Sequence, residues 1–319
     1  MLPIDPRLPD AARDALVTGM RIDEPVDDGD ALVVATSGST GEPKGVVLTH
    51  DAVRASATAT SARLDVDPVT DRWLCVLPLA HVGGLSVVTR ALHSGTSLTF
   101  DADDRRATLV SMVATQVRRT DVSRFRAVVV GGAAPPDDLP ANAITTYGMT
   151  ETGSGVVYDG HPLDGVEVRA VDGEVHVRGP MLLRAYRSGI DPKTAHGWFP
   201  TGDAGDVIEG RVVVRGRIGD VIVTGGEKVW PEPVEVVLGA VPGVRDVAIT
   251  GVVDPEWGQR VVAYVVGDDA TPPSLEQLRD AVKAVLPAYC APKELLLVDA
   301  IPRTALGKVR RAALRAKRD

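Results

Sequence analysis

The first part of the chain alternates between short apolar runs and longer stretches of mixed polarity. The apolar runs are bounded by Gly, Pro or Asp, which is the pattern of buried strands. The mixed stretches have helical composition and contain no helix breaker. This alternation favours an α/β layer with a mainly parallel sheet. The predicted strands are 31–35, 45–48, 73–77, 97–100 and 127–130, and the predicted helices are 51–63, 85–92 and 108–118.

Two regions depart from this pattern. Residues 1–30 are rich in Asp and Pro and are predicted to form an irregular lead-in. Between residues 166 and 214, polar and apolar residues alternate with a period of two in segments joined by Gly-containing turns. This alternation predicts an antiparallel, barrel-like β subdomain.

The pattern changes again after Arg217, where strands and helices are expected to form a compact α+β unit. We therefore predict an α/β protein with two domains. The large N-terminal domain, 1–217, holds the mainly parallel sheet and the barrel-like β subdomain, and a small α+β C-terminal domain spans 218–319. The strands expected in the small domain are 221–223, 295–298 and two near 247 and 262, and its helices are 231–238, 275–285 and 309–317.

Composition narrows the class of protein. The 319 residues are 44% hydrophobic, which is enough for a large core, and the net charge of −8 argues against a uniformly basic nucleic-acid binder. Cys75 and Cys290 have neither metal-site nor disulfide spacing, so we expect two reduced, buried thiols in a cytoplasmic protein. Neither a signal peptide nor an apolar stretch long enough for membrane insertion is visible.

A loop rich in glycine and hydroxyl side chains follows the first predicted strand and leads into the returning arm of a hairpin. Glycines let backbone N–H groups point inward as a nest for anions, and Lys44 supplies a positive charge for outer phosphates. It is not a Walker loop, because Pro43 precedes Lys44 and no Ser or Thr follows. A flexible turn is the alternative, but such a turn does not need this combination. The candidates for phosphate binding are Thr36, Ser37, Gly38, Ser39, Thr40 and Lys44.

This loop resembles the signature of the adenylate-forming superfamily, which includes acyl-CoA synthetases, luciferases and peptide-synthetase adenylation domains. The run from Tyr147 to Glu151, Tyr-Gly-Met-Thr-Glu, is similar to the second core motif of that superfamily. The resemblance implies that Tyr147 packs on the adenine of ATP, that Thr150 contacts the α-phosphate and that Glu151 helps hold Mg²⁺. A flat aromatic ring suits a purine face, and a hard carboxylate oxygen suits Mg²⁺.

Two further motifs follow in the order that the superfamily has. The resemblance implies that Gly131-Gly132, at the end of a predicted strand, lies against the adenine. It implies that Asp203, in Thr-Gly-Asp, accepts hydrogen bonds from the ribose hydroxyls and that Arg217 makes a second ribose or phosphate contact.

The C-terminal motifs resemble those of a domain that moves between two half-reactions. Residues 218–220 are similar to the hinge, which would make the small domain mobile, and Gly225-Gly226 would line the tunnel for the pantetheine of CoA. The run 302–310 is similar to the terminal motif and makes Lys308 the adenylation lysine. A mobile cation there can bridge the substrate carboxylate and the α-phosphate.

The acid that is activated is indicated by His81 and Arg90. The run 77–85 resembles the acid-pocket motif, so His81 is implied to lie beside the reacting carboxylate. Arg90 falls on an otherwise apolar helix, where an arginine is costly unless it pairs with an anion. A second carboxylate of the substrate is one partner, and an internal Asp or Glu is the alternative. The arrangement resembles the 2-succinylbenzoate–CoA ligase group of menaquinone biosynthesis, short actinobacterial members included, whose substrate has two carboxylates.

The resemblance thus implies a ligase that uses a small carboxylic acid, ATP with Mg²⁺, and CoA. Three alternatives stay open: an acyl-CoA synthetase for another aromatic or medium-chain acid, an adenylation domain that loads a carrier protein, and a non-catalytic nucleotide-binding remnant. The last arises because only about 35 residues precede the phosphate loop, where typical members carry another subdomain. Such a chain is expected to be either a naturally short branch or a truncated form. A homodimer is a reasonable expectation only because symmetric oligomers are common.

Overall fold

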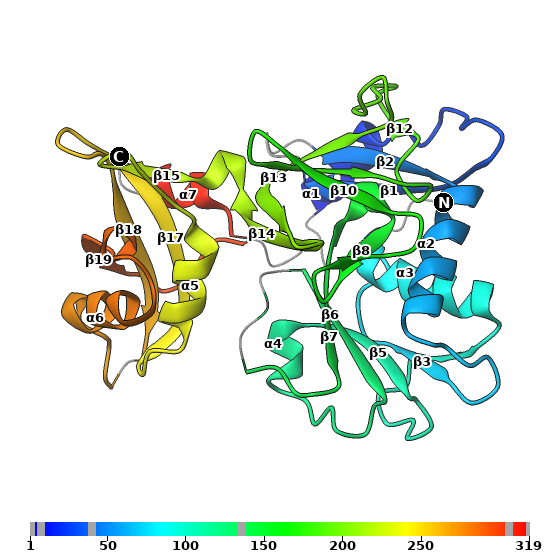
Figure 1. Cartoon of the computed structure of the whole chain (residues 1–319), viewed down its shortest axis with the longest axis horizontal. Helices are drawn as coiled ribbons and strands as arrows, with labels where there is room; N and C mark the ends of the chain where they lie inside the picture. Colours follow the sequence, from blue (N-terminus) through cyan, green and yellow to red (C-terminus); the bar gives the residue numbers. More distant parts are fainter. Residues whose placement is uncertain are drawn as a thin grey trace. The chain divides into compact units, whose positions relative to one another are not determined.

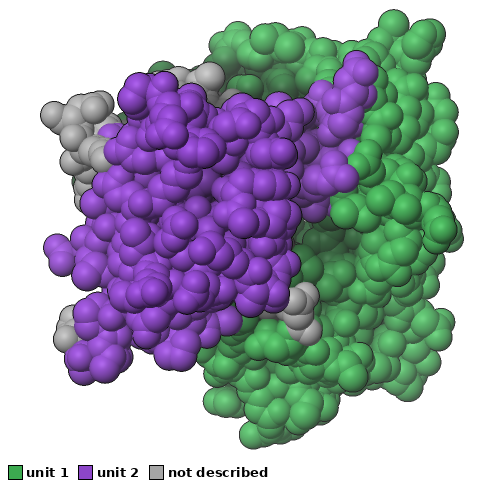
Figure 2. Space-filling model, turned by 60° about the vertical axis from the view of Figure 1, so that its left-hand side comes forward, with its two compact units in different colours: residues 1–171, 175–201, 206–213 green, residues 172–174, 202–205, 214–319 purple. Residues whose placement is uncertain are grey.

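The computed structural model divides the chain into two compact units (Figures 1 and 2). The structure describes residues 4, 10–37, 43–132, 135, 138–268, 270–303 and 309–316. Unit 1 comprises residues 1–171, 175–201 and 206–213, and unit 2 comprises residues 172–174, 202–205 and 214–319. The chain passes from unit 1 into unit 2 for the last time at Val214. The predicted domain boundary, between residues 217 and 218, lies a few residues farther along the chain and stays a prediction.

A seven-stranded sheet forms the centre of unit 1, in the order β4-β3-β5-β6-β7-β8-β9. The pairings among its first five strands are parallel, and β8 and β9 continue the sheet antiparallel. Helices α2 and α3 pack on each other and on this sheet. The elements are α2 (His50–Arg63), β3 (Arg72–Cys75), α3 (Val82–Ser94), β4 (Ser97–Thr99), β5 (Leu109–Val113), α4 (Ala114–Val117), β6 (Ala127–Gly131), β7 (Ala143–Met149), the short helix η1 (Thr150–Thr152), β8 (Ser154–Tyr158) and β9 (His161–Pro162).

The helix predicted over residues 108–118 is wrong. Its first half is strand β5, and only the four residues of α4 are helical. Strand β5 is paired on both edges, with β3 and β6, and all of its side chains but that of Val113 are buried, so both of its faces are covered. A short run that is buried on both faces carries no alternation to separate strand from helix.

A three-stranded sheet in the order β1-β2-β12 carries the predicted hairpin of unit 1. The irregular lead-in predicted for residues 1–30 is wrong in part, because it contains helix α1. Met20, just after that helix, is buried against Val33 and Val47 of the sheet. These elements are α1 (Asp10–Gly19), β1 (Asp30–Ser37), β2 (Pro43–Thr49) and β12 (Ala185–Tyr186).

The alternating segments after residue 166 form a four-stranded sheet whose residues are divided between the two units. Its order is β10-β11-β13-β14. Its strands are β10 (Glu167–Val171), β11 (Glu174–Arg178), β13 (Phe199–Ile208) and β14 (Arg211–Arg217).

Unit 2 is built on a five-stranded sheet in which the long hairpin β17–β18 is central. Alternate residues of β18 point into two separate cores: one holds Leu238 and Leu278, from α5 and α6, and the other holds Leu314, from α7. The elements are η2 (Ile218–Asp220), β15 (Ile222–Thr224), β16 (Glu227–Val229), α5 (Pro231–Gly239), β17 (Val244–Asp254), β18 (Gly258–Gly267), α6 (Leu275–Val285), η3 (Ala288–Cys290), β19 (Glu294–Leu297) and α7 (Arg311–Ala316). Among the described residues, none of the helices has the length and apolar character needed to cross a membrane.

Candidate active site

The candidate site of unit 1 lies where neighbouring parallel strands end. The carboxyl ends of parallel strands share one edge of a sheet, and open α/β sheets bind ligands there. Gly131 ends β6, and Tyr147 lies near the end of β7. A Cβ atom on Gly131 would lie 3.0 Å from Cγ2 of Thr146, and one on Gly132 would lie 3.3 Å from Cγ1 of Val113, at the end of β5. The strand ends are therefore close neighbours with little room for larger side chains.

The turn after β7 holds Thr150 and Glu151 in helix η1. Gly148 is required just before it, because a Cβ atom there would collide with the carbonyl oxygen of Ser154 on β8. The backbone N–H of Leu183 donates to the carbonyl oxygen of Glu151 over 2.8 Å, which fixes the turn from another segment. The close approach of β7 and β8 at this turn thus sets the positions of Thr150 and Glu151.

Tyr186 joins Glu151 to Lys44. It belongs to β12 and pairs with Val46 of β2, two residues beyond Lys44. Its hydroxyl donates to Oε1 of Glu151 over 3.1 Å, and Nζ of Lys44 lies 5.2 Å from the centroid of its ring. The side chains predicted for phosphate and Mg²⁺ therefore meet at one aromatic residue. Sequence reasoning missed Tyr186, because it is distant from both in the chain and belongs to no recognised motif.

The phosphate loop is described only at its two ends. Thr36 and Lys44 face each other across the β1–β2 hairpin. Of Ser37, the backbone alone is described. The candidates Gly38, Ser39 and Thr40, together with Lys308, lie outside the described residues, so their roles stay predictions.

Helix α3 brings His81 and Arg90 onto one element. His81 occupies the N-cap position, and its carbonyl oxygen accepts from the N–H of Leu85 over 3.0 Å. Arg90 lies farther along the helix and is only 3% exposed. The helix is longer than the predicted 85–92, since it begins directly after His81.

The guanidinium of Arg90 is surrounded by hydroxyl groups. Its Nη atoms lie 3.2 Å from Oγ of Ser111, 3.2 Å from Oγ of Ser154 and 3.4 Å from the hydroxyl of Tyr158. It also lies 5.5 Å from the ring centroid of Trp73, and its Nε has no hydrogen-bond partner among the residues that the structure describes. Within the described part of the chain no carboxylate pairs with Arg90. The internal Asp or Glu that we considered as its partner is therefore not found there.

The hydroxyls around Arg90 are themselves held in place. Oγ of Ser56 lies 3.0 Å from that of Ser154, and Oγ1 of Thr60 lies 3.3 Å from the hydroxyl of Tyr158. All four side chains are buried. A buried cation that has only neutral oxygen partners is costly unless an anion joins it. This cluster can therefore receive an anionic group.

Unit 2 contains the two residues predicted to contact ribose. Nε of Arg217 lies 3.0 Å from Oδ1 of Asp203, and the Asp203 carboxylate is largely buried while the arginine remains accessible. The backbone at Gly202 has a φ of +73°, and its N–H donates to Oε1 of Glu174 over 2.7 Å. The turn and the ion pair together hold Asp203 in place.

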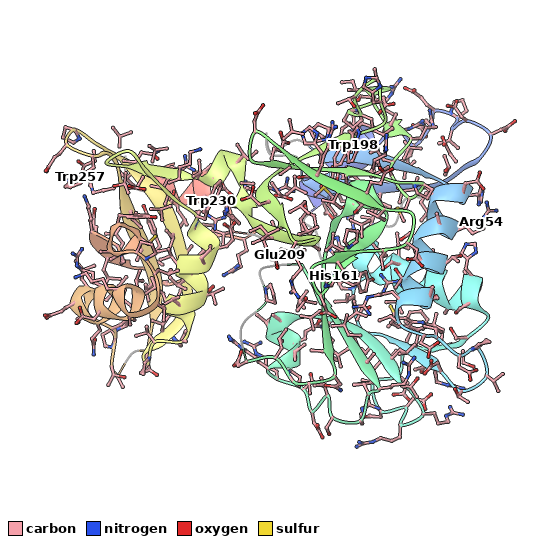
Figure 3. The ribbon with its side chains drawn as sticks, viewed as in Figure 1. Arg54, His161, Trp198, Glu209, Trp230 and Trp257 are labelled. Carbon is pink, nitrogen blue, oxygen red and sulfur yellow. The ribbon has the colours of Figure 1, made fainter. Side chains whose placement is uncertain are left out.

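Gly225 and Gly226 form the two-residue turn between β15 and β16. Their φ angles are +59° and +85°, as expected for a tight hairpin turn in which glycine is favoured. Gly225 also lies against Trp257, labelled in Figure 3, whose carbonyl oxygen accepts from its N–H over 2.9 Å. Nζ of Lys293 lies 3.1 Å from the centroid of the partly exposed Trp257 ring. Sequence reasoning missed both side chains, since neither belongs to a glycine motif.

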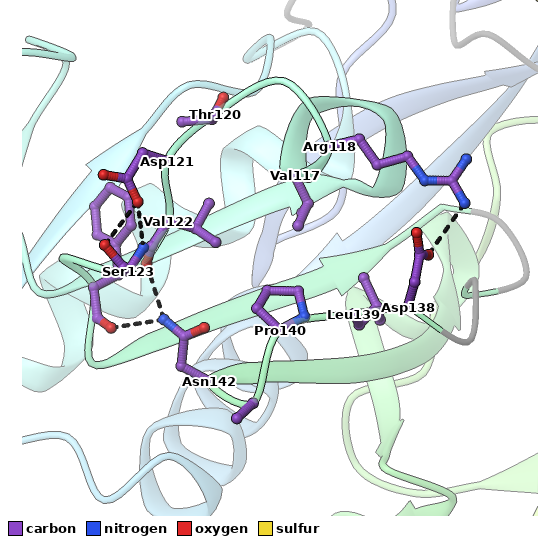
Figure 4. A pocket seen from close by; sticks show the side chains of 12 residues that line it. Val117, Arg118, Thr120, Asp121, Val122, Ser123, Asp138, Leu139, Pro140 and Asn142 are labelled. Carbon is purple, nitrogen blue, oxygen red and sulfur yellow. Dashed lines mark hydrogen bonds and ion pairs between the residues drawn. The ribbon is translucent and has the colours of Figure 1, made fainter.

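A cavity of about 680 Å³ in unit 1 lies away from these residues (Figure 4). The segments that line it precede β6 and β7, so it lies near the amino ends of those strands. The Asn142 amide donates to the carbonyl oxygens of Val122 and Phe125 there. None of the predicted site residues lines it.

A cluster of three or more His, Cys, Asp or Glu side chains suited to a metal ion does not occur among the described residues. Glu151 is the one carboxylate that the core motif supplies. Mg²⁺ in nucleotide sites is commonly held by one or two carboxylates together with substrate phosphates and water. The residues present therefore fit a Mg²⁺ ion that arrives with ATP.

Comparison with known proteins agrees with these features. The model of the AMP-binding enzyme family matches residues 5–187, and that of the AMP-binding enzyme C-terminal domain matches 233–308. A protein of Mycobacterium tuberculosis, named a probable 2-succinylbenzoate–CoA ligase, is 41% identical over 94% of this chain and 88% of its own length. The 2-succinylbenzoate–CoA ligase of Enterococcus faecalis is 32% identical over 88% of this chain and 68% of its own.

The structural comparison points the same way. The o-succinylbenzoate CoA synthetase of Bacillus subtilis, solved with its acyl-adenylate intermediate, has a TM-score of 0.82 and 29% identity, over 92% of this chain and 72% of that one. The same enzyme has also been solved with ATP and a magnesium ion. The chain described here belongs to the family of AMP-binding, adenylate-forming enzymes.

Proposed function

We propose that this chain is an ATP-dependent 2-succinylbenzoate–CoA ligase. It converts 2-succinylbenzoate, ATP and CoA into 2-succinylbenzoyl-CoA, AMP and diphosphate through an acyl-adenylate, and so serves menaquinone biosynthesis. The observation that carries the choice of acid is Arg90, a buried guanidinium with hydroxyl partners and no carboxylate partner in the described part of the chain. The names of the curated relatives support the same acid.

The two carboxylates of the acid have different roles in this proposal. One lies beside His81 and attacks the α-phosphorus of ATP. The other binds Arg90, because a planar guanidinium binds a carboxylate with two parallel hydrogen bonds. A neutral acid would leave the buried guanidinium without an anion, which disfavours its binding.

The first half-reaction needs positioning and neutralisation of charge more than covalent chemistry. Tyr147 packs on the adenine beside Gly131 and Gly132, and Asp203 and Arg217 bind the ribose. The loop residues Thr36 to Thr40, with Lys44, bind the outer phosphates, while Thr150 contacts the α-phosphate. Glu151 holds Mg²⁺, which neutralises phosphate charge when it is bound. Lys308 stabilises the charge that moves onto diphosphate.

The second half-reaction follows a rotation of the C-terminal domain about residues 218–220. The rotation withdraws Lys308 and brings Gly225 and Gly226 to the acyl-adenylate. The CoA thiolate then attacks the acyl carbon, and AMP leaves. Trp257, whose ring covers Gly225, offers an apolar surface for the pantetheine arm.

We also propose that the protein acts in the cytoplasm and assembles as a homodimer, with no nucleic-acid or membrane partner. Both cysteines are free and buried, and burial raises the pKa of each thiol, which suits a reducing compartment. The homodimer rests only on the frequency of symmetric assemblies.

The test is acid-dependent ATP–diphosphate exchange with 2-succinylbenzoate, benzoate and octanoate. Wild type is expected to exchange with 2-succinylbenzoate, and Arg90→Leu to lose about a hundredfold or more of that rate, since a buried charge pair is worth several kcal/mol. Arg90→Lys, which keeps the charge but not the planar fork, should lose less. Exchange with benzoate or octanoate that Arg90→Leu leaves unchanged would keep the ligase and reject this acid. Transfer to a carrier protein but not to CoA would identify a loading domain, and no exchange with any acid would indicate a remnant.

A further inference from the structure

Strand β12, which carries Tyr186, is only two residues long. It lies at the edge of its three-stranded sheet, beside β2 (Figure 1). An arginine flanks it at each end, Arg184 before it and Arg187 after it. The main-chain N–H groups of Arg184 and Arg187 donate to carbonyl oxygens of β2 over 2.9 and 2.6 Å. Because so short a strand makes few hydrogen bonds of its own, the position of Tyr186 depends on what these two arginines bind.

The side chain of Arg187 binds the segment that follows helix α1. Its Nε and Nη atoms donate to four main-chain carbonyl oxygens over 3.2, 2.9, 2.6 and 3.0 Å, and these oxygens belong to Met20, Arg21, Glu24 and Pro25. The last turn of α1 contains no basic residue. Carbonyl oxygens at the end of a helix carry partial negative charge, which a nearby cation stabilises. Arg187 supplies this cation from a distant part of the chain.

Arg184 binds the same N-terminal segment from the other end of β12. Its Nε and Nη2 each lie 2.8 Å from a carboxylate oxygen of Asp30, and its Nη1 lies 2.8 Å from Oδ2 of Asp27. The side chain of Asp30 is buried. Two parallel hydrogen bonds fix a guanidinium to a carboxylate in both distance and plane. Both ends of β12 are therefore attached to residues 20–30, which we call the anchor segment.

The anchor segment also packs beside the lysine predicted to bind phosphate. A Cβ atom on Gly45, the residue after Lys44, would lie 2.8 Å from Cβ of Arg187 and 2.8 Å from Sδ of Met20. Glycine permits this close approach of side chains to the main chain of a strand. Arg187 and the buried Met20 therefore contact β2 directly beside Lys44.

We propose that Arg187 is a positioning residue for the Mg²⁺–ATP site, and that it acts by fixing Tyr186 on β2. The inference rests on the proposed roles of Lys44 and Glu151. The hydroxyl of Tyr186 donates to Glu151 over 3.1 Å, and groups that bond a metal ligand in this way set its orientation. Without the side chain of Arg187, the two-residue strand separates more readily from β2. Tyr186 then no longer directs Glu151.

The test is to measure by calorimetry how ATP binding to the full chain depends on Mg²⁺, with no acid present. In Arg187→Met, the Mg²⁺ concentration for half-maximal ATP binding should rise by about threefold to tenfold, since the carboxylate is no longer oriented. Amide hydrogen exchange of residues 184–190 should become faster in the same variant. A wild-type Mg²⁺ requirement in Arg187→Met would overturn the proposal.

A double-variant cycle separates this role from a general loss of stability. Tyr186→Leu removes the side chain through which Arg187 acts. Adding Arg187→Met to it should therefore raise the Mg²⁺ requirement by less than about twofold. If the two effects multiply in the double variant, the residues act independently and the proposal fails.

Arg124→Met is the matched control, because Arg124 also donates to main-chain carbonyl oxygens, those of Asp104 and Ala102, and belongs to none of the predicted motifs. It should keep the wild-type Mg²⁺ requirement, and a rise equal to that of Arg187→Met would contradict a specific role. If Arg187→Met does not fold, Arg187→Gln keeps two donors and should show the same coupling to Tyr186 at about twofold to threefold. A folded Arg187→Gln without that coupling would reject the anchor.

The choice of acid is decided separately, by wild-type exchange with 2-succinylbenzoate, because ATP binding is measured without any acid. Wild-type ATP binding that does not depend on Mg²⁺ would overturn the inference together with the role of Glu151.

Discussion

Tyr186 contributes two different groups to the candidate site, and they can be removed one at a time. Its hydroxyl bonds Glu151 and its ring lies beside Lys44. A hydrogen bond to a charged group is worth about 1.5–3 kcal/mol. We therefore expect Tyr186→Phe to raise the Mg²⁺ concentration for half-maximal ATP–diphosphate exchange by about tenfold. The KM for ATP should change little, because the ring remains.

Tyr186→Leu is the matched comparison, since it also removes the ring from Lys44. It should raise both the Mg²⁺ requirement and the KM for ATP. Calorimetry of ATP binding with and without Mg²⁺ gives a readout that does not depend on turnover. If Tyr186→Phe binds ATP with the same Mg²⁺ dependence as wild type, the hydroxyl does not position Glu151.

The residues of the site differ in how far the sequence could identify them. Tyr147, Thr150 and Glu151 are adjacent in one motif, so a single match names all three. Tyr186 reaches the same place only because β12 pairs with β2, and no local pattern records that pairing. The partners of Arg90 come from β5 and β8, so the sequence predicted a buried cation and left its neighbours open. Residues of one local motif can be identified from the sequence, whereas contacts between distant segments depend on how the strands pair and in which register.

At the scale of elements, the two glycines of the turn between β15 and β16 allow the cost of backbone strain to be measured apart from the cost of a side-chain contact. Both glycines have positive φ, but only at Gly225 would a Cβ atom meet a neighbour, 2.8 Å from the Trp257 ring. We expect Gly225→Ala to lower the free energy of unfolding by more than the roughly 1–2 kcal/mol of a left-handed alanine. The KM for CoA should rise while ATP–diphosphate exchange is retained.

Gly226→Ala is the control for the backbone term alone, since nothing lies within 4 Å of its added Cβ atom. Denaturant unfolding of the two variants measures the difference. Equal losses of stability in both would mean that the Trp257 ring moves aside without cost.

Helix α5 makes the stability of unit 2 depend on pH. Burial raises the pKa of Glu232 and of Glu235 above the ordinary 4.5, against the opposing attraction of Arg311. A raised folded-state pKa gives stability that is fully present below the unfolded value and is lost as pH rises through the folded value. The free energy of unfolding should therefore fall as the pH is raised above about 4.5.

Glu232→Gln tests this, because Oε2 of Glu232 has no hydrogen-bond partner among the described residues. The variant should show a flatter profile of stability against pH and should be more stable than wild type at neutral pH. Denaturant melts at several pH values between 4 and 8 measure it. A variant that is less stable at pH 7 but equal at pH 4 would show the opposite sign, and so reject a raised pKa.

The errors of prediction among the elements have physical causes. Strand β5 is buried on both faces, so its apolar run could equally suit a helix. Helix α1 lies in a stretch whose many Asp and Pro residues mask its short apolar side. In contrast, the observed ends of α6 agree with the predicted range 275–285, and Ser274 and Gln277 form a capping box at its start. The ends of α6 thus agree with its prediction, whereas the identity of β5 as a strand depends on its pairing with β3 and β6.

At the scale of the whole molecule, Gly219 lies in the segment that we propose as the hinge. A Cβ atom there would meet nothing within 4 Å, so the folded structure does not require glycine. We expect Gly219→Ala to keep stability and adenylation near the wild-type values. Transfer to CoA should slow by about threefold to tenfold, because alanine restricts the backbone rotation.

Lys308→Ala gives the mirror image, with adenylation lost and transfer from a supplied acyl-adenylate retained. The two half-reactions are measured separately by ATP–diphosphate exchange and by release of AMP on addition of CoA. If Gly219→Ala and Lys308→Ala impair the same half-reaction, the division of roles between hinge and lysine is wrong.

The hydroxyl groups around Arg90 solvate the buried guanidinium much as alcohol molecules would, except that they are covalently fixed to the protein. Ser111, Ser154 and Tyr158 can each turn a lone pair or a hydrogen toward a neighbour, as a solvent molecule does, but they cannot leave. In the free enzyme they direct lone pairs at the cation. When an anion enters, the same groups can rotate their hydrogens toward it without being displaced. In bulk water, solvent molecules around a cation would have to rearrange when an anion binds. Around Arg90, that rearrangement is reduced to rotations of a few hydroxyl groups that folding has already put in place.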